Sequence, residues 1–242
     1  MNFDIETLNP YAAFIEGGTA ARIVSACARS GLDLAGWCRV EHYNREVPPN
    51  FHLPDGGEPH RAVIVIGNTR ALWPHFLDHL REDPERMQQP DPIDNYVEQR
   101  VHAATAGEST VQEVRFSHEL PPRLFAAQRL AHVAGLAHLG ENNLCVHPVV
   151  GPWLALRAAV ILDEPGPEKP PALAHPCGDC THQCAPLLQR ILASNPPAPW
   201  TEWLALRESC PVGQAYRYSD AQIHYHYLKQ PELLRRAVEA LP

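Results

Sequence analysis

Four cysteines that lie close together in the C-terminal third of the chain are the residues best suited to chemistry. They are Cys177, Cys180, Cys184 and Cys210. The first three follow the spacing C-x2-C-x3-C, and the fourth comes 26 positions later and is followed directly by proline. Close cysteines that form a cradle, closed by a distant Cys-Pro, are typical of iron–sulfur ligation. The spacing therefore favours an iron–sulfur cluster, of the 4Fe-4S type.

Two other chemistries fit the same four thiols. Four thiolates can hold zinc tetrahedrally, although structural zinc usually shows two C-x2-C pairs and only Cys177 and Cys180 have that spacing. The same pair could be a redox-active or simply reduced dithiol. His175 and His182 flank the cysteines and could replace one ligand. Iron–sulfur, zinc and metal-free thiols all remain open at this point.

Length and composition restrict the classes of protein that could carry these cysteines. With 242 residues and 27.0 kDa, the chain can bury one sizeable core, so we expect a single domain over 1–242. A formal charge of -8 argues against nucleic-acid binding. No stretch reaches the ~18 apolar residues that span a bilayer, and the N-terminus carries acids where a secretory leader carries lysine or arginine. We therefore expect a cytoplasmic protein without a membrane partner.

The reducing environment expected for such a protein bears on how its cysteines are used. There are seven, an odd number, and four of them cluster in one region, which favours a metal or redox site over disulfides. The other three lie in apolar surroundings and are expected to be small core residues. These are Cys27, Cys38 and Cys145.

Apolar periodicity and turn residues predict a chain of mixed helices and strands. Helices are expected over 10–31, 71–81, 91–104 and 122–139, and strands over 62–66, 111–117, 143–148 and 155–162. A connector with five prolines is expected over 163–176, followed by a cysteine-rich, mainly helical region over 177–242 with helices at 185–194, 201–208 and 220–240. The HYHY string at 224–227 is expected on the helix surface, because alternate residues of a helix do not share a face.

Five unusual strings occur along the chain in one order. They are PPNFHLP (48–54), DPIDNYV (91–97), AHVAG (131–135), CVHPVVGPWLALR (145–157) and RYSDAQ (217–222). Their set and order resemble the cobalamin-processing CblC family of intracellular vitamin B12 carriers, over about 43–233. The resemblance implies an α+β fold in which a nitroreductase-like antiparallel sheet is flanked by helices. Periodicity alone does not select this fold.

Two of these regions are also similar to epoxyqueuosine reductase, a cobalamin enzyme with iron–sulfur clusters. The similar strings are AGLAHLGENNLCVHP (134–148) and CGDCTHQCAP (177–186). The chain departs from both families, because animal CblC proteins lack the cysteine cluster and the reductase has two full cysteine sets where this chain has four residues. Glu119 lies near, but out of register with, the catalytic acid of the reductase relatives.

The resemblance implies a corrin-binding role for residues around the string at 145–157. A large, flat macrocycle needs a broad pocket and backbone that can approach closely, which glycine allows. The implied residues are His147, Pro148, Gly151 and Trp153, although the string alone also fits a hairpin with a buried aromatic. The resemblance also places His132 against the corrin as a binding residue, not as an axial ligand, because the family holds cobalamin with its own base detached and no protein histidine in its place.

Three arginines form a candidate anion-binding set. Guanidinium groups hold carboxylates bidentately, and glutathione, the thiol of the animal relatives, presents two carboxylates. Arg157 and Arg217 match the family positions directly, and Arg207 matches if one residue is inserted after Trp203. A single exposed arginine is ordinarily a surface residue, so the assignment depends on the set of three.

Three functions follow from these residues together with the two resemblances. The first is an enzyme that binds cobalamin derivatives and removes their upper axial ligand, by reductive decyanation, by thiol-dependent dealkylation with glutathione, or by both. The second is a reductase that keeps cobalamin and an iron–sulfur cluster as working cofactors for an organic substrate. The third is a carrier without enzymatic activity whose cysteines hold structural zinc. An electron-donating reductase as partner and a flavin as cofactor are compatible with the first function.

Overall fold

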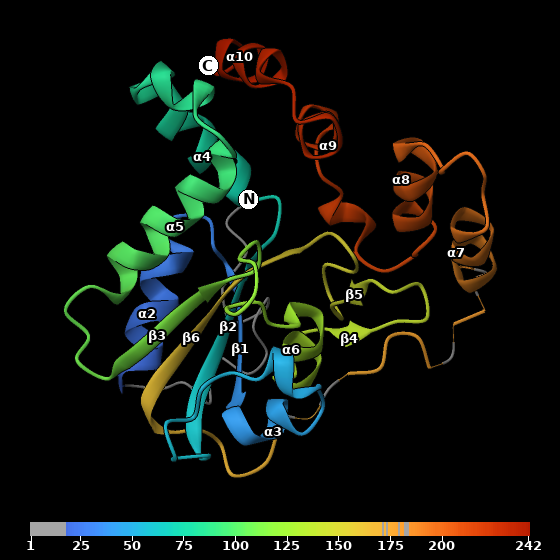
Figure 1. The fold of residues 1–242 in the computed structure, drawn as a ribbon. Coiled ribbons are helices and arrows are strands. Elements are labelled where there is room, and N and C mark those ends of the chain that lie inside the picture. The colour runs from blue at the N-terminus through green and yellow to red at the C-terminus, as the bar shows by residue number, and fades with distance from the viewer. Residues whose placement is uncertain (1–17, 171, 173, 179, 182–183) are drawn as a thin grey trace.

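A four-stranded antiparallel sheet forms the centre of the fold, with strand order β1-β2-β6-β3 (Figure 1). This computed structural model describes residues 18–170, 172, 174–178, 180–181 and 184–242. The strands are β1 (Leu34–Arg39), β2 (Arg61–Asn68), β3 (Val111–Phe116) and β6 (Ala155–Pro165). The antiparallel sheet predicted by the family resemblance is therefore present, and its nitroreductase-like character stays a prediction.

The two middle strands are buried on both faces, as the continuous apolar run at 62–66 predicts. Successive residues of a strand point to opposite sides. Ala62, Ile64 and Ile66 accordingly pack into the core on one face of the sheet, and Val63 and Val65 pack into the core on the other. Strand β6 alternates in the same way. Burial of both faces explains why these strands are apolar throughout.

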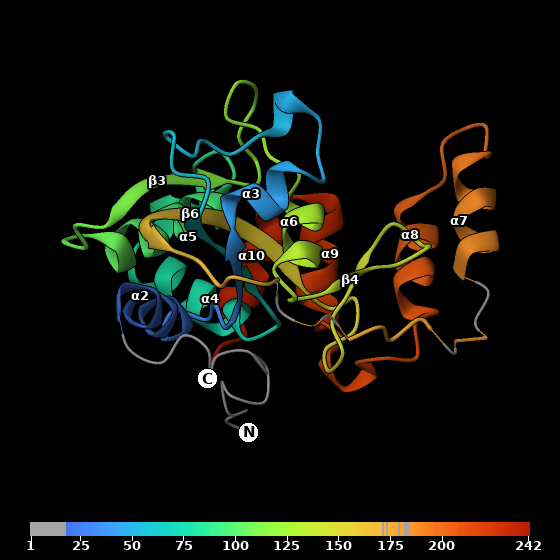
Figure 2. The ribbon, with the colours of Figure 1, turned by 90° about the horizontal axis from the view of Figure 1, so that it is seen from below.

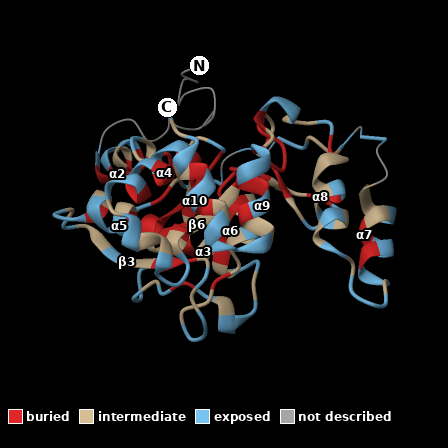
Figure 3. Ribbon diagram, turned by 90° about the horizontal axis from the view of Figure 1, so that it is seen from above, coloured by how far each residue is buried: buried red, intermediate tan, exposed pale blue. Residues whose placement is uncertain are grey.

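Two layers of helices cover the sheet (Figures 2 and 3). Residues of α2 (Gly18–Ala28), α4 (Leu72–Glu82), α5 (Pro92–Thr105) and α10 (Pro231–Glu239) belong to the first core cluster. Residues of α3 (Val40–Asn44) and α6 (Ala127–Val133) belong to the second. Helix α9 (Asp220–Leu228) contributes to both, because Ile223 packs in the second cluster and Tyr225 in the first.

The cysteine-rich region stands to one side of this core (Figure 2). Helices α7 (Cys184–Leu192) and α8 (Trp200–Glu208) pack against each other through a small cluster of Leu188, Ile191 and Leu206. A short hairpin of β4 (His138–Leu139) and β5 (Cys145–Val146) lies between α6 and these helices. Short 3-10 turns complete the structure at η2 (Pro49–Phe51), η3 (Pro84–Gln88) and η4 (Gln214–Tyr216).

Two of the expected helices are wrong in extent. In place of a helix over 122–139, the chain has only α6, because the prolines at 121 and 122 disfavour helix before it and Gly135, at φ +71°, ends it. The helix expected over 220–240 is divided where Lys229 adopts φ +52° and a proline begins α10. Residues 10–17 of the helix expected over 10–31 lie outside the described residues. None of the described helices combines the length and the apolar character that crossing a bilayer requires.

Two glycines join the cysteine-rich region to the core. Gly151 and Gly213 both have positive φ, at +60° and +74°, and their backbones lie against each other. A Cβ on Gly151 would stand 1.9 Å from the carbonyl oxygen of Val212, and one on Gly213 would stand 2.1 Å from the carbonyl of Val150. Neither backbone has room for a side chain, so this contact requires glycine on both sides.

Replacing Gly151 with alanine should therefore disrupt its contact with 212–213. We expect Gly151→Ala to lower the free energy of unfolding by roughly 3 kcal/mol or more, since the methyl group meets backbone that cannot move aside. Gly57→Ala is the matched control, because Gly57 has φ +84° but open space around it, so only the cost of its backbone conformation, on the order of 1 kcal/mol, applies. Urea denaturation measures both. Equal losses would mean that the contact contributes nothing.

Candidate functional site

His147 builds the turn that leads from β5 into β6. Its ring is fully buried, and its Nδ1 accepts hydrogen bonds from the backbone N–H groups of Val149, at 3.0 Å, and Val150, at 3.2 Å. The backbones of His147 and Gly151 also pair as an antiparallel bridge. His147, Pro148 and Gly151 were expected to contact a macrocycle. In the structure, His147 and Gly151 shape this turn and hold it against 212–213. Contact of His147, Pro148 and Gly151 with a macrocycle stays a prediction.

Trp153 lies at the centre of a group of aromatic and cationic side chains. It is fully buried, and the ring of Tyr218 meets it edge-on at 5.7 Å between centroids. The guanidinium carbons of Arg207 and Arg217 lie 5.7 and 5.9 Å from the centre of the Trp153 ring, within the range of cation–π attraction. Arg207 also lies 5.9 Å from the Tyr218 ring. The expected buried aromatic is therefore present, and the arginines gather around it.

Arg157 reaches the same region from β6. Its Nε donates to Oδ1 of Asn68 at 2.7 Å, and its Nη1 donates to Oδ1 of Asp94 at 3.3 Å. Its Nη2 is buried and has no partner among the described residues. The Arg157 side chain keeps 11% of its surface exposed, so two neighbours hold a nearly buried cation in one orientation. A buried guanidinium in this state needs such pairing to be tolerated.

The three predicted arginines are close together but not equivalent. Arg217 donates to Glu208 and Asp220, both at 2.8 Å, and these carboxylates raise its pKa and balance its charge. No carboxylate of a described residue lies within salt-bridge distance of Arg207. The charges of Arg157 and Arg207 both act on the hydroxyl of Tyr218. The structure therefore leaves Arg157 and Arg207 as the cations able to receive an added anion.

His132 lines a different pocket from Arg207. Its Nδ1 accepts from the backbone N–H of Leu139 at 3.2 Å, and its partial burial lowers its pKa. An open pocket on that side of α6 is lined by His42, Arg45, Glu46, His132, Val133, Glu168 and Pro170. A second pocket is lined by Ala127, Gln128, Leu144, Cys145, Pro152, Leu154, Leu156 and Arg207. Helix α6 contributes to both pockets. Of the expected corrin-binding residues, His132 lines the first pocket and none lines the second.

The four clustered cysteines line one small pocket, which is closed by Asn142, Val146, Pro176, Ser209, Pro211 and Val212. None of these four described cysteines forms a disulfide. Burial and the neighbouring cysteines raise the pKa of Cys177 and Cys184. Burial raises the pKa of Cys210 as well. Within the described ranges, no three His, Cys, Asp or Glu side chains stand close enough together to hold a metal ion. The four predicted ligands therefore share one pocket, and their binding of a metal stays a prediction.

Histidine rings extend from this pocket toward α6. The ring of His175 lies 4.0 Å from that of His138, and His138 lies 5.4 Å from His132. His182, the other histidine expected to flank the cysteines, lies outside the described residues. His138 was not singled out from the sequence, and its place in the β4 hairpin could be recognised only in the folded chain.

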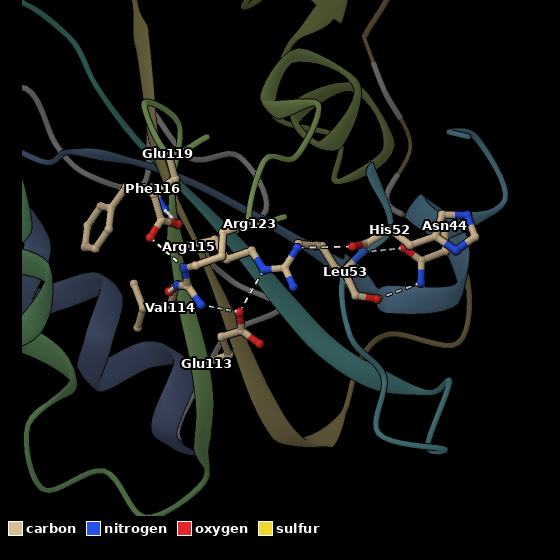
Figure 4. A network of polar contacts seen from close by, with 9 residues as sticks. All are labelled: Asn44, His52, Leu53, Glu113, Val114, Arg115, Phe116, Glu119 and Arg123. Carbon is tan, nitrogen blue, oxygen red and sulfur yellow. Dashed lines mark hydrogen bonds and ion pairs between the residues drawn. The ribbon is translucent and has the colours of Figure 1, made fainter. Parts of the chain in front are cut away.

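Glu119 is occupied in a network of ion pairs (Figure 4). It accepts from the backbone N–H of Phe116 at 2.9 Å and from Nε of Arg123 at 2.7 Å. Arg123 and Arg115 both donate to Glu113 at 2.8 Å, and Arg115 also donates to the carbonyl of His52 at 3.2 Å. The network ties β3 to the PPNFHLP segment. Glu119 is therefore engaged in structure and is not placed as a free acid.

Sequence reasoning missed several polar residues around Arg157. Asn68 and Asp94 hold Arg157, and Tyr218 packs on Trp153. Asp94 and Tyr218 lie inside strings that carried the family resemblance. The HYHY string was expected on a helix surface. That expectation is wrong for Tyr225, which is 2% exposed, and for Nε2 of His226, which is buried. Helix α9 packs across the end of the sheet, which its local pattern does not reveal.

Comparisons with known proteins were made on both sequence and structure. The model of the methylmalonic aciduria and homocystinuria type C family matches residues 34–236. Human cyanocobalamin reductase / alkylcobalamin dealkylase is 30% identical over 210 residues, covering 77% of this chain and 70% of the human protein. The Danio rerio protein of the same name is 27% identical over 212 residues, covering 77% of this chain and 79% of its own.

Two solved structures share the fold. The B12-trafficking protein CblC of C. elegans, described as a homologue of the human protein, superposes with a TM-score of 0.70 at 19% identity, covering 93% of this chain and 98% of that chain. An epoxyqueuosine reductase superposes with a TM-score of 0.51 at 13% identity, covering 88% of this chain and 69% of that chain. At these low sequence identities, the comparison shows a shared fold and nothing more.

The burial of the cysteines predicts their order of reaction with iodoacetamide. Burial raises the pKa of Cys27 and Cys145 to about 12 and raises that of Cys38 as well, so these thiols should stay unmodified at pH 8 in the folded protein. In metal-free protein, the exposed Cys180 should react first. Peptide mass mapping after timed alkylation measures this order. Early modification of Cys38 in folded protein would contradict the buried arrangement.

Proposed function

The chain belongs to the methylmalonic aciduria and homocystinuria type C family, and on this premise we propose that it is an enzyme that processes cobalamin by removing the upper axial ligand of B12 derivatives. The relatives named cyanocobalamin reductase / alkylcobalamin dealkylase support this proposal at 27–30% identity. The fold shared with a B12-trafficking protein is consistent with it.

The observation that carries the proposal is the meeting of three distant family strings at one place. Asp94 from DPIDNYV pairs with Arg157 at 3.3 Å. Arg157 itself ends the string at 145–157, which also contains Trp153. Tyr218, from RYSDAQ, packs on Trp153 at 5.7 Å between ring centroids. Residues more than a hundred positions apart thus form one group of aromatic and charged side chains.

This group of side chains suits a thiol co-substrate that carries carboxylates. Arginine holds carboxylates through charge-assisted hydrogen bonds, and Arg157 and Arg207 have donors to offer. In the dealkylation that we propose, the thiolate sulfur attacks the alkyl carbon, the cobalt–carbon bond breaks, and its electron pair stays on cobalt. The products are a thioether and reduced cobalamin. The protein's contribution is to hold the thiol in line with that bond.

We place the cobalamin derivative over α6. The pocket that contains His132 and the pocket that contains Gln128 and Arg207 both use residues of this seven-residue helix, so a flat macrocycle broad enough to cross it would meet both. The lining of the second pocket includes Leu144, Leu154 and Leu156, whose apolar side chains suit the face of a corrin ring. His132 would contact the macrocycle from its edge.

The cysteine pocket is proposed to hold the iron–sulfur cluster, with Cys177, Cys180, Cys184 and Cys210 as ligands. Four cysteines that form no disulfide line one pocket, which fits the donor chemistry of such a cluster, and the described thiols would have to close further around it. A bound cluster would supply single electrons for reductive removal of cyanide. Zinc at the same four thiols remains the alternative and would make the pocket a structural clip.

A second candidate function is the reduction of an organic substrate with cobalamin and a cluster as working cofactors. The observation in its favour is that Asn142 and Val146, from the string similar to epoxyqueuosine reductase, line the cysteine pocket. Against it stands Glu119, which is bound to Arg123 and to the backbone of Phe116 and so is not available as a free acid. Decyanation and dealkylation are therefore favoured.

Titration with methylcobalamin tests the central proposal. Purified protein should shift the spectrum of methylcobalamin from the base-on to the base-off form, and glutathione should then convert the bound methylcobalamin to reduced cobalamin under anaerobic conditions. Both changes are followed by absorption spectroscopy. A spectrum that stays unchanged at protein concentrations well above ~1 µM, which corresponds to about 8 kcal/mol of binding free energy, would overturn it.

Metal analysis of Cys180→Ser tests the cluster. Anaerobically prepared protein should contain iron and sulfide in comparable amounts, and the variant should lose the iron and decyanate more slowly. Dealkylation by thiol needs no external electron and should persist in proportion to the folded fraction. Cys38→Ser, outside the cysteine pocket, should keep the iron. Zinc without iron in the unmodified protein would leave the cysteines a structural role only.

A further inference from the structure

A buried carboxylate lies at the edge of the sheet where β1 begins and β2 ends. It belongs to Asp33, which directly precedes β1, while Asn68 ends β2 and Thr69 follows it. The register of the two strands pairs Leu34 with Gly67, so these three residues come to the same edge. All three are buried. A carboxylate in such a place is tolerated only when hydrogen bonds compensate for the lost water.

Both oxygens of the Asp33 carboxylate accept hydrogen bonds from Thr69. The backbone N–H of Thr69 donates to Oδ1 at 2.7 Å, and its hydroxyl donates to Oδ2 at 2.6 Å. The hydroxyl oxygen in turn accepts from the backbone N–H of Ala71, at 3.1 Å, where α4 begins. Hydrogen bonds to an ionised group are about twice as strong as neutral ones. Asp33 therefore fixes both the backbone and the side chain of Thr69.

The carbonyl of Thr69 decides how the amide of Asn68 is turned. Asn68 Nδ2 donates to this carbonyl at 2.8 Å, and Asn68 Oδ1 accepts from Nε of Arg157 at 2.7 Å. The opposite orientation would bring Nδ2 toward the guanidinium, and both of these groups can only donate. It would also bring Oδ1 against the carbonyl oxygen. The position of Thr69 thus directs Oδ1 of Asn68 at Arg157.

The orientation of Arg157 depends on this contact. Its bond to Asn68, at 2.7 Å, is shorter than its bond to Asp94, at 3.3 Å. Because a guanidinium is planar and rigid, holding Nε and Nη1 fixes the whole group. Without the Asn68 contact, Asp94 alone among the described residues would hold Arg157, and the group could rotate about that single bond. A series of hydrogen bonds therefore connects the Asp33 carboxylate to Arg157.

We propose that Asp33 is a positioning residue for Arg157, which acts through Thr69 and Asn68 without touching a substrate. The inference rests on the proposed function, in which Arg157 takes part in the reaction with the thiol. It adds to that function a carboxylate on the far side of two strands from Arg157. Groups that react or bind must be held to within about 0.5 Å, and supporting residues of this kind supply that precision.

Hydrogen exchange at Arg157 tests the positioning directly. The exchange rate of its Nε–H with solvent is measured by NMR on the full chain, and the signal is identified by its absence in Arg157→Lys. Thr69→Val removes the hydroxyl with little change of shape and so takes one hydrogen bond from Asp33. We expect Nε–H of Arg157 to exchange about tenfold faster, as for loss of a hydrogen bond to a charged group. Thr69→Ser keeps the hydroxyl and should restore the rate.

Thr105→Val is the matched control. It also removes a buried threonine hydroxyl, which donates to the carbonyl of Val101 at 3.0 Å and has no bond to the series from Asp33 to Arg157. Both Val variants should lose stability in urea denaturation, but Nε–H of Arg157 should exchange at its ordinary rate in Thr105→Val. A merely structural role of Thr69 would give the two variants the same exchange rate at Arg157.

The kinetics of Asp33→Asn give a second test, because this variant keeps the shape of the side chain and replaces one acceptor with a donor. In dealkylation of methylcobalamin, KM for glutathione should rise about fivefold while kcat stays unchanged. The rate with 2-mercaptoethanol, which has no carboxylate for an arginine to hold, should also stay unchanged. Equal losses with both thiols would mean that Asp33 supports only the fold. Asp33→Asn also serves in the exchange measurement, where Nε–H of Arg157 should again exchange faster.

The outcomes separate this inference from the proposed function. An unchanged exchange rate at Arg157 in Thr69→Val and Asp33→Asn would overturn the positioning role, even where the unmodified protein dealkylates methylcobalamin. Faster exchange in Thr105→Val as well would overturn it too, because the effect would then be a general loosening. Faster exchange confined to Thr69→Val and Asp33→Asn, in a protein that does not dealkylate, would support the positioning of Arg157 and contradict the proposed function instead.

Discussion

The antiparallel pairing of β2 with β6 is the constraint on which the rest of the structure depends. The two strands pair from Arg61 opposite Pro165 to Asn68 opposite Ala155, and they are buried on both faces. Because both faces of these strands are packed in the core, a shift of register would disrupt the packing on both sides, so the pairing is strongly specified. It places Asn68, at the end of β2, beside the start of β6, where Arg157 can donate to it at 2.7 Å.

A buried arginine is the main functional consequence of that register. Taking a guanidinium out of water is costly unless it is paired, and Asn68 and Asp94 supply the partners from β2 and α5. With its Nε and Nη1 held, Arg157 keeps a single orientation, and its Nη2 is buried without a partner among the described residues. The aromatic residues Trp153 and Tyr218 are buried and pack edge-on, and the charge of Arg157 acts on the Tyr218 hydroxyl. Burial of this kind strengthens an ion pair.

The cysteine-rich region depends on the same part of the fold through a second contact. The turn at 147–151, held by His147, brings Gly151 against Gly213. This close approach positions Cys210 in one pocket with Cys177, Cys180 and Cys184. The turn thus serves both regions, because its other end continues into Trp153 and Arg157. A metal centre at the cysteines and a thiol site at the arginines would be connected by one short segment of backbone.

The sequence by itself determined the central strand at 62–66, the cysteine cluster, the buried Cys27, Cys38 and Cys145, and the family, because local periodicity and distinctive strings carry that information. It did not reveal that Arg217 is neutralised by Glu208 and Asp220, or that Glu119 is held by Arg123. Only the tertiary structure brought Asn68, Asp94 and His226 to Arg157. The physical reason is that the free donors of a side chain depend on which distant segments pack against it, and packing across a sheet leaves no mark in the spacing of nearby residues.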